Sequence, residues 1–168
     1  MEVFEAIRTM LAVRTYEAKP VPEATLHRVV EAGRLTGSAK NLQPWHFVVV
    51  QERETLRQLG RLARTGGHVA QAAAAIVVAV EPSPFAVSDA SRAIQSMLLA
   101  AWGDGVGGNW VGFGGLEDVR ALLGIPSGLD VLAILPLGYP AGVTGRGKKR
   151  RKPLVSVAHR ERYGRRLE

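Results

Sequence analysis

The sequence predicts an α+β fold in one domain that spans residues 1–168. The chain is 168 residues long and 46% hydrophobic, which is enough for one domain with a sizeable core. Segments with helical spacing of apolar residues are mixed with short β-branched runs in an irregular order. This mixture favours α+β over a regular succession of βαβ units. No internal repeat or domain boundary is visible, and residues 142–168 read as a basic C-terminal extension of the same domain.

Two helices are predicted first, over Glu2–Leu11 and Glu23–Leu35, because apolar residues recur there at spacings of three and four. Pro22 is well placed as the first residue of the second helix, and Glu23 suits the positive end of its dipole. The buried stripe of this second helix is predicted to consist of Leu26, Val29, Val30, Gly33 and Leu35.

A strand is predicted at His46–Gln51, where an almost unbroken apolar run indicates that both faces are covered. Glu52–Arg64 follows as a helix with leucines on one side and charged residues on the other. The alanine-rich segment Ala72–Val80 is expected to be the end of a helix that runs into a second buried strand.

The second half of the chain contains a central helix at Asp89–Trp102, which is apolar nearly all round. Asp89 opens this helix, so capping or stabilisation of the helix dipole is its expected role. The remaining elements are a short strand at Asn109–Val111, a helix at Leu116–Leu123 and a buried strand at Val131–Leu137.

Composition excludes several classes of protein. The chain has no cysteine, which rules out disulfides, thiolate zinc sites, cysteine-ligated iron–sulfur clusters and thiol catalysis. No apolar run approaches the roughly 18 residues that a membrane span needs. The first five residues include two acids and no basic residue, unlike a secretory signal. We therefore expect a cytoplasmic protein with no membrane partner.

The net charge of +7 is concentrated at the C-terminus. Residues 142–168 carry ten Lys or Arg and two Glu, whereas residues 1–141 carry twelve Lys or Arg and thirteen Asp or Glu. Such a tail can bind a phosphate group, an acidic membrane or nucleic acid, or can be a solvated arm. It has no aromatic residue before Tyr163, which disfavours nucleic-acid binding.

Ser38–Trp45, between the second helix and the first strand, is the stretch in which polar side chains concentrate. Turn chemistry explains Ser38 and Asn41, but it does not explain Gln43 or Trp45. Amide groups beside an aromatic residue suit a flat ligand, whose rim needs donors and acceptors and whose face needs apolar cover. An ordinary loop is the alternative interpretation.

Other motif-like strings do not carry a function. Gly103, Gly105 and Gly108 match the dinucleotide fingerprint as letters, but a helix precedes them and a strand follows, the reverse of what that site requires. The segment 142–148 mimics a phosphate-binding loop without the Ser or Thr that would hold magnesium. The four histidines show no ligand spacing, so no metal site is expected.

Several segments together resemble the FMN-dependent nitroreductase family. Thr36–Trp45 resembles its P-S-x-x-N-x-Q-P-W segment, and Lys149–Leu154 resembles its K-x-R-x-P segment. The family's R-x-S-x-R run corresponds to Met10–Arg14, where only Arg14 is retained. The likeness continues through the helix Asp89–Ala101 and ends with the G-I-P and L-G-Y-P motifs, so it spans nearly the whole chain in the right order.

The resemblance implies a central, mostly antiparallel sheet flanked by helices, in an intertwined homodimer with flavin mononucleotide (FMN) at the subunit interface. NAD(P)H would give a hydride to flavin N5, and a nitroaromatic, quinone or similar acceptor would take it, so no acid–base catalyst is expected. The resemblance implies that the phosphate and ribityl groups are contacted by Arg14, Lys149 and Arg151. Ring and ribityl contacts fall to Ser38, Asn41 and Gln43 of the neighbouring subunit, and backbone N–H groups near Val111 and Gly112 would face N5.

A non-catalytic dimer on the same fold is the alternative, binding flavin or a deazaflavin for storage or sensing. Met10 and Ala12 motivate it, because they replace the family's Arg and Ser and so remove two polar contacts to FMN. The link between the second strand and Asp89 is also short, which predicts an open, shallow site.

Overall fold

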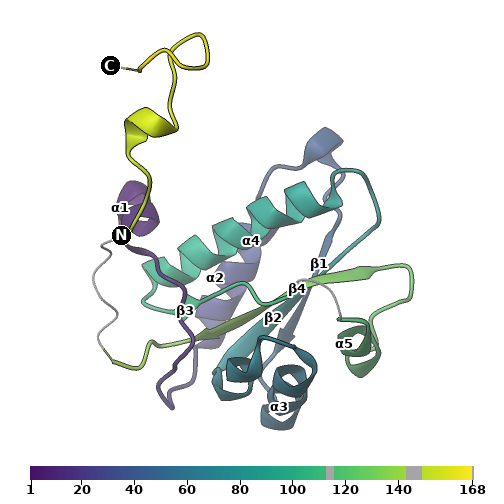
Figure 1. Ribbon diagram of the computed structural model, residues 1–168. Coiled ribbons are helices and arrows are strands. Elements are labelled where there is room, and N and C mark those ends of the chain that lie inside the picture. Colours follow the sequence, from purple (N-terminus) through teal and green to yellow (C-terminus); the bar gives the residue numbers. More distant parts are fainter. Residues whose placement is uncertain (113–115, 143–148, 168) are drawn as a thin grey trace.

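The computed structural model describes residues 1–112, 116–142 and 149–167, and its centre is a sheet between two layers of helices (Figure 1). The order of its strands is β1-β2-β4-β3, and each neighbouring pair is antiparallel. The predicted antiparallel sheet flanked by helices is therefore confirmed. The strands are β1 (Trp45–Val50), β2 (Ala74–Val80), β3 (Gly107–Gly108) and β4 (Asp130–Gly138).

The helices divide between the two faces of the sheet, as Figure 1 shows. α2 (Glu23–Arg34) and α4 (Ala86–Gly103) cover one face, and α3 (Arg53–Leu62) and α5 (Glu117–Leu122) cover the other. Successive side chains of a strand point to opposite faces, so Ile76 of β2 packs towards α2 and α4, whereas Val77 packs towards α3 and α5. The short helix α1 (Val3–Thr9) lies at the C-terminal end of α4.

The prediction that both faces of the first strand are covered is wrong for the single chain. β1 is at the edge of the sheet, and Val49 is 40% exposed. β2 lies between β1 and β4 and is buried at every residue. Both strands are runs of apolar residues, so composition did not distinguish the edge strand from the central one.

The glycine-rich segment after α4 also differs from the prediction. The short strand is Gly107–Gly108 rather than Asn109–Val111, and Val111 forms an isolated bridge with Ile134. This strand pairs with Gly138 and Leu137 of β4. The N-terminal segment also packs closely on it: a Cβ at Gly107 would lie 2.4 Å from Cγ2 of Val13, so glycine is needed there.

Several boundaries shift by a few residues. Pro22 precedes α2 as its N-cap residue, and the helix ends at Arg34, which leaves Leu35 67% exposed rather than in the buried stripe. The predicted helix end before β2 is a 3-10 helix, η2 (Gly67–Gln71), and it stops before Ala72. The other predicted helices and strands are present where the apolar periodicity indicated.

Candidate functional site

The loop between α2 and β1 holds three non-glycine residues in the left-handed backbone region. Lys40, Asn41 and Gln43 have φ angles of 51°, 56° and 50°. Lys40 and Asn41 belong to a 3-10 helix, η1 (Ala39–Asn41). Each left-handed non-glycine residue costs of order 1–3 kcal/mol, and such residues cluster at functional sites. A loop that only reverses the direction of the chain does not need three such residues, so this backbone indicates a functional site.

Side chains of the same loop hold it together and leave amide groups at the surface. The Gln43 N–H donates to Oγ of Ser38 at 2.9 Å, and Gln43 Nε2 donates to Oδ1 of Asn41 at 3.2 Å. Asn41 and Gln43 are exposed, so both amides are open to a ligand. Trp45 is only 7% exposed and stacks on Phe47, which makes it a core residue rather than cover for a ligand.

Asp89 secures this loop from the neighbouring helix. Its side chain is fully buried, Oδ2 accepts the Ala39 N–H at 3.0 Å, and Oδ1 is paired with Arg92. α4 begins at Ala86, so Asp89 lies inside the first turn and does not cap its own helix. Its place in the first turn confirms the predicted stabilisation of the helix dipole, whereas the predicted capping of α4 is wrong. The carboxylate instead accepts from the first residue of η1, a helix that begins 50 positions earlier.

Arg14 lies on a segment that is bound to the far edge of the sheet. The Val13 N–H donates to the Gly108 carbonyl at 3.1 Å, and the Tyr16 hydroxyl donates to the Val13 carbonyl at 2.8 Å. Burial raises the pKa of Tyr16, although the charge of Arg14 works in the opposite direction. Arg14 itself is exposed, and no carboxylate of the described chain pairs with its guanidinium.

The basic tail comes back to α1, and its first described residue after Gly142 is Lys149. Nζ of Lys149 donates to the carbonyl of Ile7 in the last turn of that helix. Partial burial, with the nearby charge of Arg151, lowers the pKa of Lys149. Beyond this contact the segment projects away from the body of the molecule (Figure 1). Residues 143–148, which include most of the string that mimics a phosphate-binding loop, lie outside the described residues.

The segment expected to face the flavin offers one backbone donor, not two. The N–H of Val111 donates to the Ile134 carbonyl at 2.9 Å, and Val111 is 3% exposed. That part of the prediction is corrected, because a sheet hydrogen bond occupies the donor. Gly112 has φ +123°, and no acceptor for its N–H lies among residues 1–112, 116–142 and 149–167.

Sequence reasoning found no ligand spacing among the four histidines and predicted no partner for His68. Its Nε2 lies 3.0 Å from Oδ1 of Asn109, a polar side chain that is only 6% exposed. His68 is 41 positions away in sequence and shares no motif with Asn109, so only the folded chain reveals the pair.

Within one chain these groups do not meet. The loop of Ser38, Asn41 and Gln43 is tied to Asp89 near the start of α4, whereas α1 and Lys149 are tied to its end by a 3.0 Å bond from Trp102 to Thr9. Between Asp89 and Trp102 the helix is continuous, and at ~1.5 Å per residue this is about 20 Å. Figure 1 shows η1 and α1 at opposite ends of α4.

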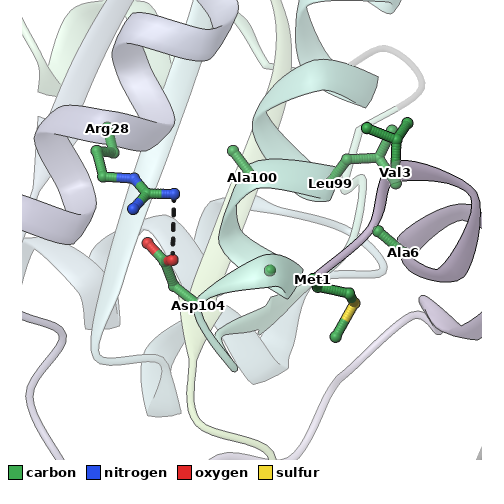
Figure 2. Close-up of a pocket in the computed structure, with 8 residues that line it drawn as sticks. Met1, Val3, Ala6, Arg28, Leu99, Ala100 and Asp104 are labelled. Carbon is green, nitrogen blue, oxygen red and sulfur yellow. Dashed lines mark ion pairs between the residues drawn. The ribbon is translucent and has the colours of Figure 1, made fainter.

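A cavity of about 360 Å³ lies between α1, α2 and the end of α4 (Figure 2). Val3 and Leu99 line one side of it, and the ion pair of Arg28 and Asp104 at 3.3 Å lines the other. Two further apolar residues of α1 are uncovered, since Phe4 and Ile7 are 68% and 47% exposed.

Two kinds of site are not found in the described residues. No helix among them is long and apolar enough to cross a membrane. No group of three or more His, Cys, Asp or Glu side chains among them could hold a metal ion.

Comparison with known proteins identifies the family. A model described as the Nitroreductase family matches residues 7–83 and 66–139. A protein of Methanothermobacter thermautotrophicus with the provisional name NADH dehydrogenase/NAD(P)H nitroreductase is 38% identical over 150 residues, covering 84% of this chain and 78% of the relative. A solved structure from Bacteroides thetaiotaomicron with the same provisional name has a TM-score of 0.87 at 30% identity, covering 96% and 98% of the two chains.

A third similar protein is the NADPH:FMN oxidoreductase of Vibrio harveyi, whose structure was solved in complex with NAD⁺. It has a TM-score of 0.83 at 26% identity and covers 96% of this chain and 77% of that one. The family model covers well over half of the chain, and the matched regions include β1, β2 and β4. The chain belongs to the Nitroreductase family.

Proposed function

We propose that this protein is an NAD(P)H-dependent FMN oxidoreductase that reduces a nitroaromatic, a quinone or a similar small acceptor, and that it acts as a homodimer in the cytoplasm. Family membership and the activities named for its relatives support the general activity. The observation that carries the proposal is the strained loop at residues 38–43, which displays two exposed amides. When bound, FMN would supply ping-pong hydride transfer through N5.

Three basic side chains suit the phosphate end of FMN. Arg14 is exposed on a rigid segment, and its planar guanidinium can make paired charge-assisted bonds to a phosphate. Lys149 is anchored beside α1, and Arg151 follows two positions later in an exposed segment. The lowered pKa of Lys149 reflects the cost of holding its charge there with Arg151 nearby, and a bound phosphate would offset that cost.

The opposite end of FMN requires a second copy of the chain. Ser38, Asn41 and Gln43 are too far from Lys149 within one protomer, so we assign them to the partner's contribution to each site. The apolar outer side of α1 and the adjacent cavity give this dimer a surface to bury. The exposed apolar residues of the tail suit the same purpose, which supports an intertwined arrangement: Leu154, Val155 and Val157.

Gly112 is the group that we assign to the reactive edge of the ring. Its φ of +123° is accessible to glycine and rare for other residues, and its N–H has no acceptor among the described residues. A backbone donor at this edge stabilises negative charge on the reduced ring. Because the N–H of Val111 is bonded to the carbonyl of Ile134 in the sheet, the N–H of Gly112 would be the only one of the two to donate to this edge.

The alternative is a dimer that binds flavin or a deazaflavin without turnover. Met10 and Ala12 favour it, because neither side chain can bond to a phosphate. Steady oxidation of NADH or NADPH in the presence of a nitro or quinone acceptor would decide against this alternative. Bound flavin with no turnover for any such acceptor would decide for it.

The proposal is tested by titrating FMN into the apoprotein and following the quenching of flavin fluorescence. Arg14→Ala and Lys149→Ala each remove a charged hydrogen-bond donor worth about 1.5–3 kcal/mol, so each should weaken binding by about 10- to 100-fold. Arg64→Ala removes an exposed arginine from the end of α3 and serves as the control. Equal affinity for all four proteins would refute the assigned phosphate site.

A further inference from the structure

A polar contact joins η2 to the segment that carries Gly112. Asn109 is buried, and its Oδ1 lies 3.0 Å from Nε2 of His68. The amide is oriented by its other end, because Nδ2 donates to the carbonyl of Trp110 at 3.2 Å. Oδ1 must therefore be the atom that faces His68, and it needs a donor. The contact is a hydrogen bond from His68 to Asn109 in the tautomer that carries the proton on Nε2.

The residues from Asn109 to Gly112 are fixed one after another. Val111 exchanges two backbone hydrogen bonds with Ile134, at 2.9 and 2.8 Å. Nε1 of Trp110 donates to the Gly112 carbonyl at 3.0 Å. These contacts fix the middle and the end of the segment, and Asn109 fixes its beginning. The direction of the Gly112 N–H depends on the peptide units that precede it, so each of these contacts helps to aim that group.

His68 is held rigidly enough to serve as the anchor. Its neighbour Gly66 packs directly on the segment, since a Cβ at Gly66 would lie 2.4 Å from Cγ1 of Val111. Val69 on the other side is fully buried. η2 is also tied to α3, because Arg53 donates to the carbonyls of Ala70 and Ala72 at 3.0 and 3.1 Å. The imidazole therefore projects from a fixed backbone towards Asn109.

We propose that His68 is a positioning residue of the flavin site, which acts through Asn109 to hold the Gly112 N–H in the direction that stabilises the reduced flavin. The inference rests on the proposed function. His68 does not transfer a proton or a hydride in this role. Loss of its Nε2–H would leave a buried carbonyl oxygen of Asn109 without a donor, and the segment would shift or admit water to satisfy it.

A positioning role for His68 predicts a change in the midpoint potential of the bound flavin, whereas a purely structural contact does not. A donor aimed at the reduced ring binds the reduced flavin more tightly than the oxidised form, so it raises the midpoint potential of the bound flavin. His68→Leu should weaken binding of reduced FMN about tenfold more than binding of oxidised FMN. For a two-electron couple this tenfold difference lowers the midpoint potential by about 30 mV.

The experiment measures the midpoint potential of FMN bound to the full-length protein, together with the affinity of the apoprotein for oxidised FMN. His68→Gln keeps a nitrogen donor at a similar reach, and it should restore the potential to within about 10 mV of wild type. His27→Leu makes the same change at an exposed position of α2 and should leave the potential unchanged. If His68→Leu does not fold, Asn109→Ser removes the amide oxygen that bonds to His68 and leaves the histidine in place.

The outcomes separate this inference from the proposed function. A lower potential in His68→Leu that is restored in His68→Gln supports the positioning role. A lower melting temperature with an unchanged potential would show that the contact is structural, and it would overturn the inference alone. Wild-type protein that binds no FMN would overturn the proposed function, and the inference with it.

Discussion

Removal of the Asp89 carboxylate should loosen the loop at residues 38–43 and thereby reduce both stability and FMN affinity. Asp89 is fully buried and is the acceptor for the Ala39 N–H at 3.0 Å. Asp89→Ala leaves that N–H without its acceptor. It also releases Ala39, the residue that directly precedes Lys40 and Asn41, both of which are in the left-handed region.

The magnitude follows from the two contacts of the carboxylate. A hydrogen bond to a charged group is worth about 1.5–3 kcal/mol. The pair with Arg92 adds at most about 1 kcal/mol, because the arginine side chain is 56% exposed and solvent screens it. Asp89→Ala should therefore cost about 2–4 kcal/mol, which lowers the melting temperature by about 5–15 °C for a chain of this length. Asp89→Asn keeps an acceptor for Ala39 but loses the charge, and it should cost about half as much.

The assay is urea unfolding of the apoprotein, followed by FMN titration of the variants that fold. Glu31→Ala is the matched control, since it removes the same kind of helical i,i+3 pair, with Arg34, at an exposed site. The control should unfold at nearly the same urea midpoint as wild type, because solvent screens this surface pair, and it should bind FMN like wild type. A loss below about 1 kcal/mol in Asp89→Ala, or an unchanged FMN affinity, would refute the reasoning.

Three further predictions concern stability. Lys40→Gly should raise the free energy of unfolding by about 0.5–1 kcal/mol, because glycine relieves the left-handed strain; a lower urea midpoint would contradict this. Gly66→Ala should lower the same free energy by about 1–3 kcal/mol through its clash with Val111, and an unchanged melting temperature would argue against that contact. The hydrogen bond from Arg61 lowers the pKa of Glu54, so this stabilisation is present above the unfolded carboxylate's pKa and is lost as the pH falls through the lowered value. The free energy of unfolding, measured by urea titration at a series of acidic pH values, should accordingly fall less steeply with decreasing pH in Glu54→Gln than in wild type. An identical dependence on pH would refute the assignment.

Local patterns predicted most of the fold because each helix and strand is encoded within a short window. Apolar periodicity located α2, α3 and α4, and the β-branched runs located β1, β2 and β4. The edge position of β1 was not predictable in this way, since it depends on the pairing of β2 with a strand about 50 positions later. The short strand was misplaced because it depends on pairing with the end of β4, which lies about 30 positions away in another part of the chain.

In the candidate site, too, local features were predicted from the sequence and long-range contacts were not. The loop residues Ser38, Asn41 and Gln43 were named from their composition. The hydrogen bond by which Asp89 secures the loop was not predicted, because it joins residues 50 positions apart. The contact of His68 with Asn109 could not be predicted, because a hydrogen bond across 41 positions leaves no spacing signal. The ligand contacts assigned to the loop, Arg14 and the tail stay predictions.

The position of β2 has a consequence for synthesis of the chain. β2 is a seven-residue apolar segment with no proline or charge, the kind of strand that aggregates when it is exposed. β1 precedes it and can cover one edge as soon as β2 leaves the ribosome, but the other edge pairs with β4, which begins about 50 positions later. At about 5–20 residues per second that edge stays unpaired for about 3–10 s in every nascent chain. Translation speed and chaperone supply, rather than final stability, should therefore limit the yield of soluble protein.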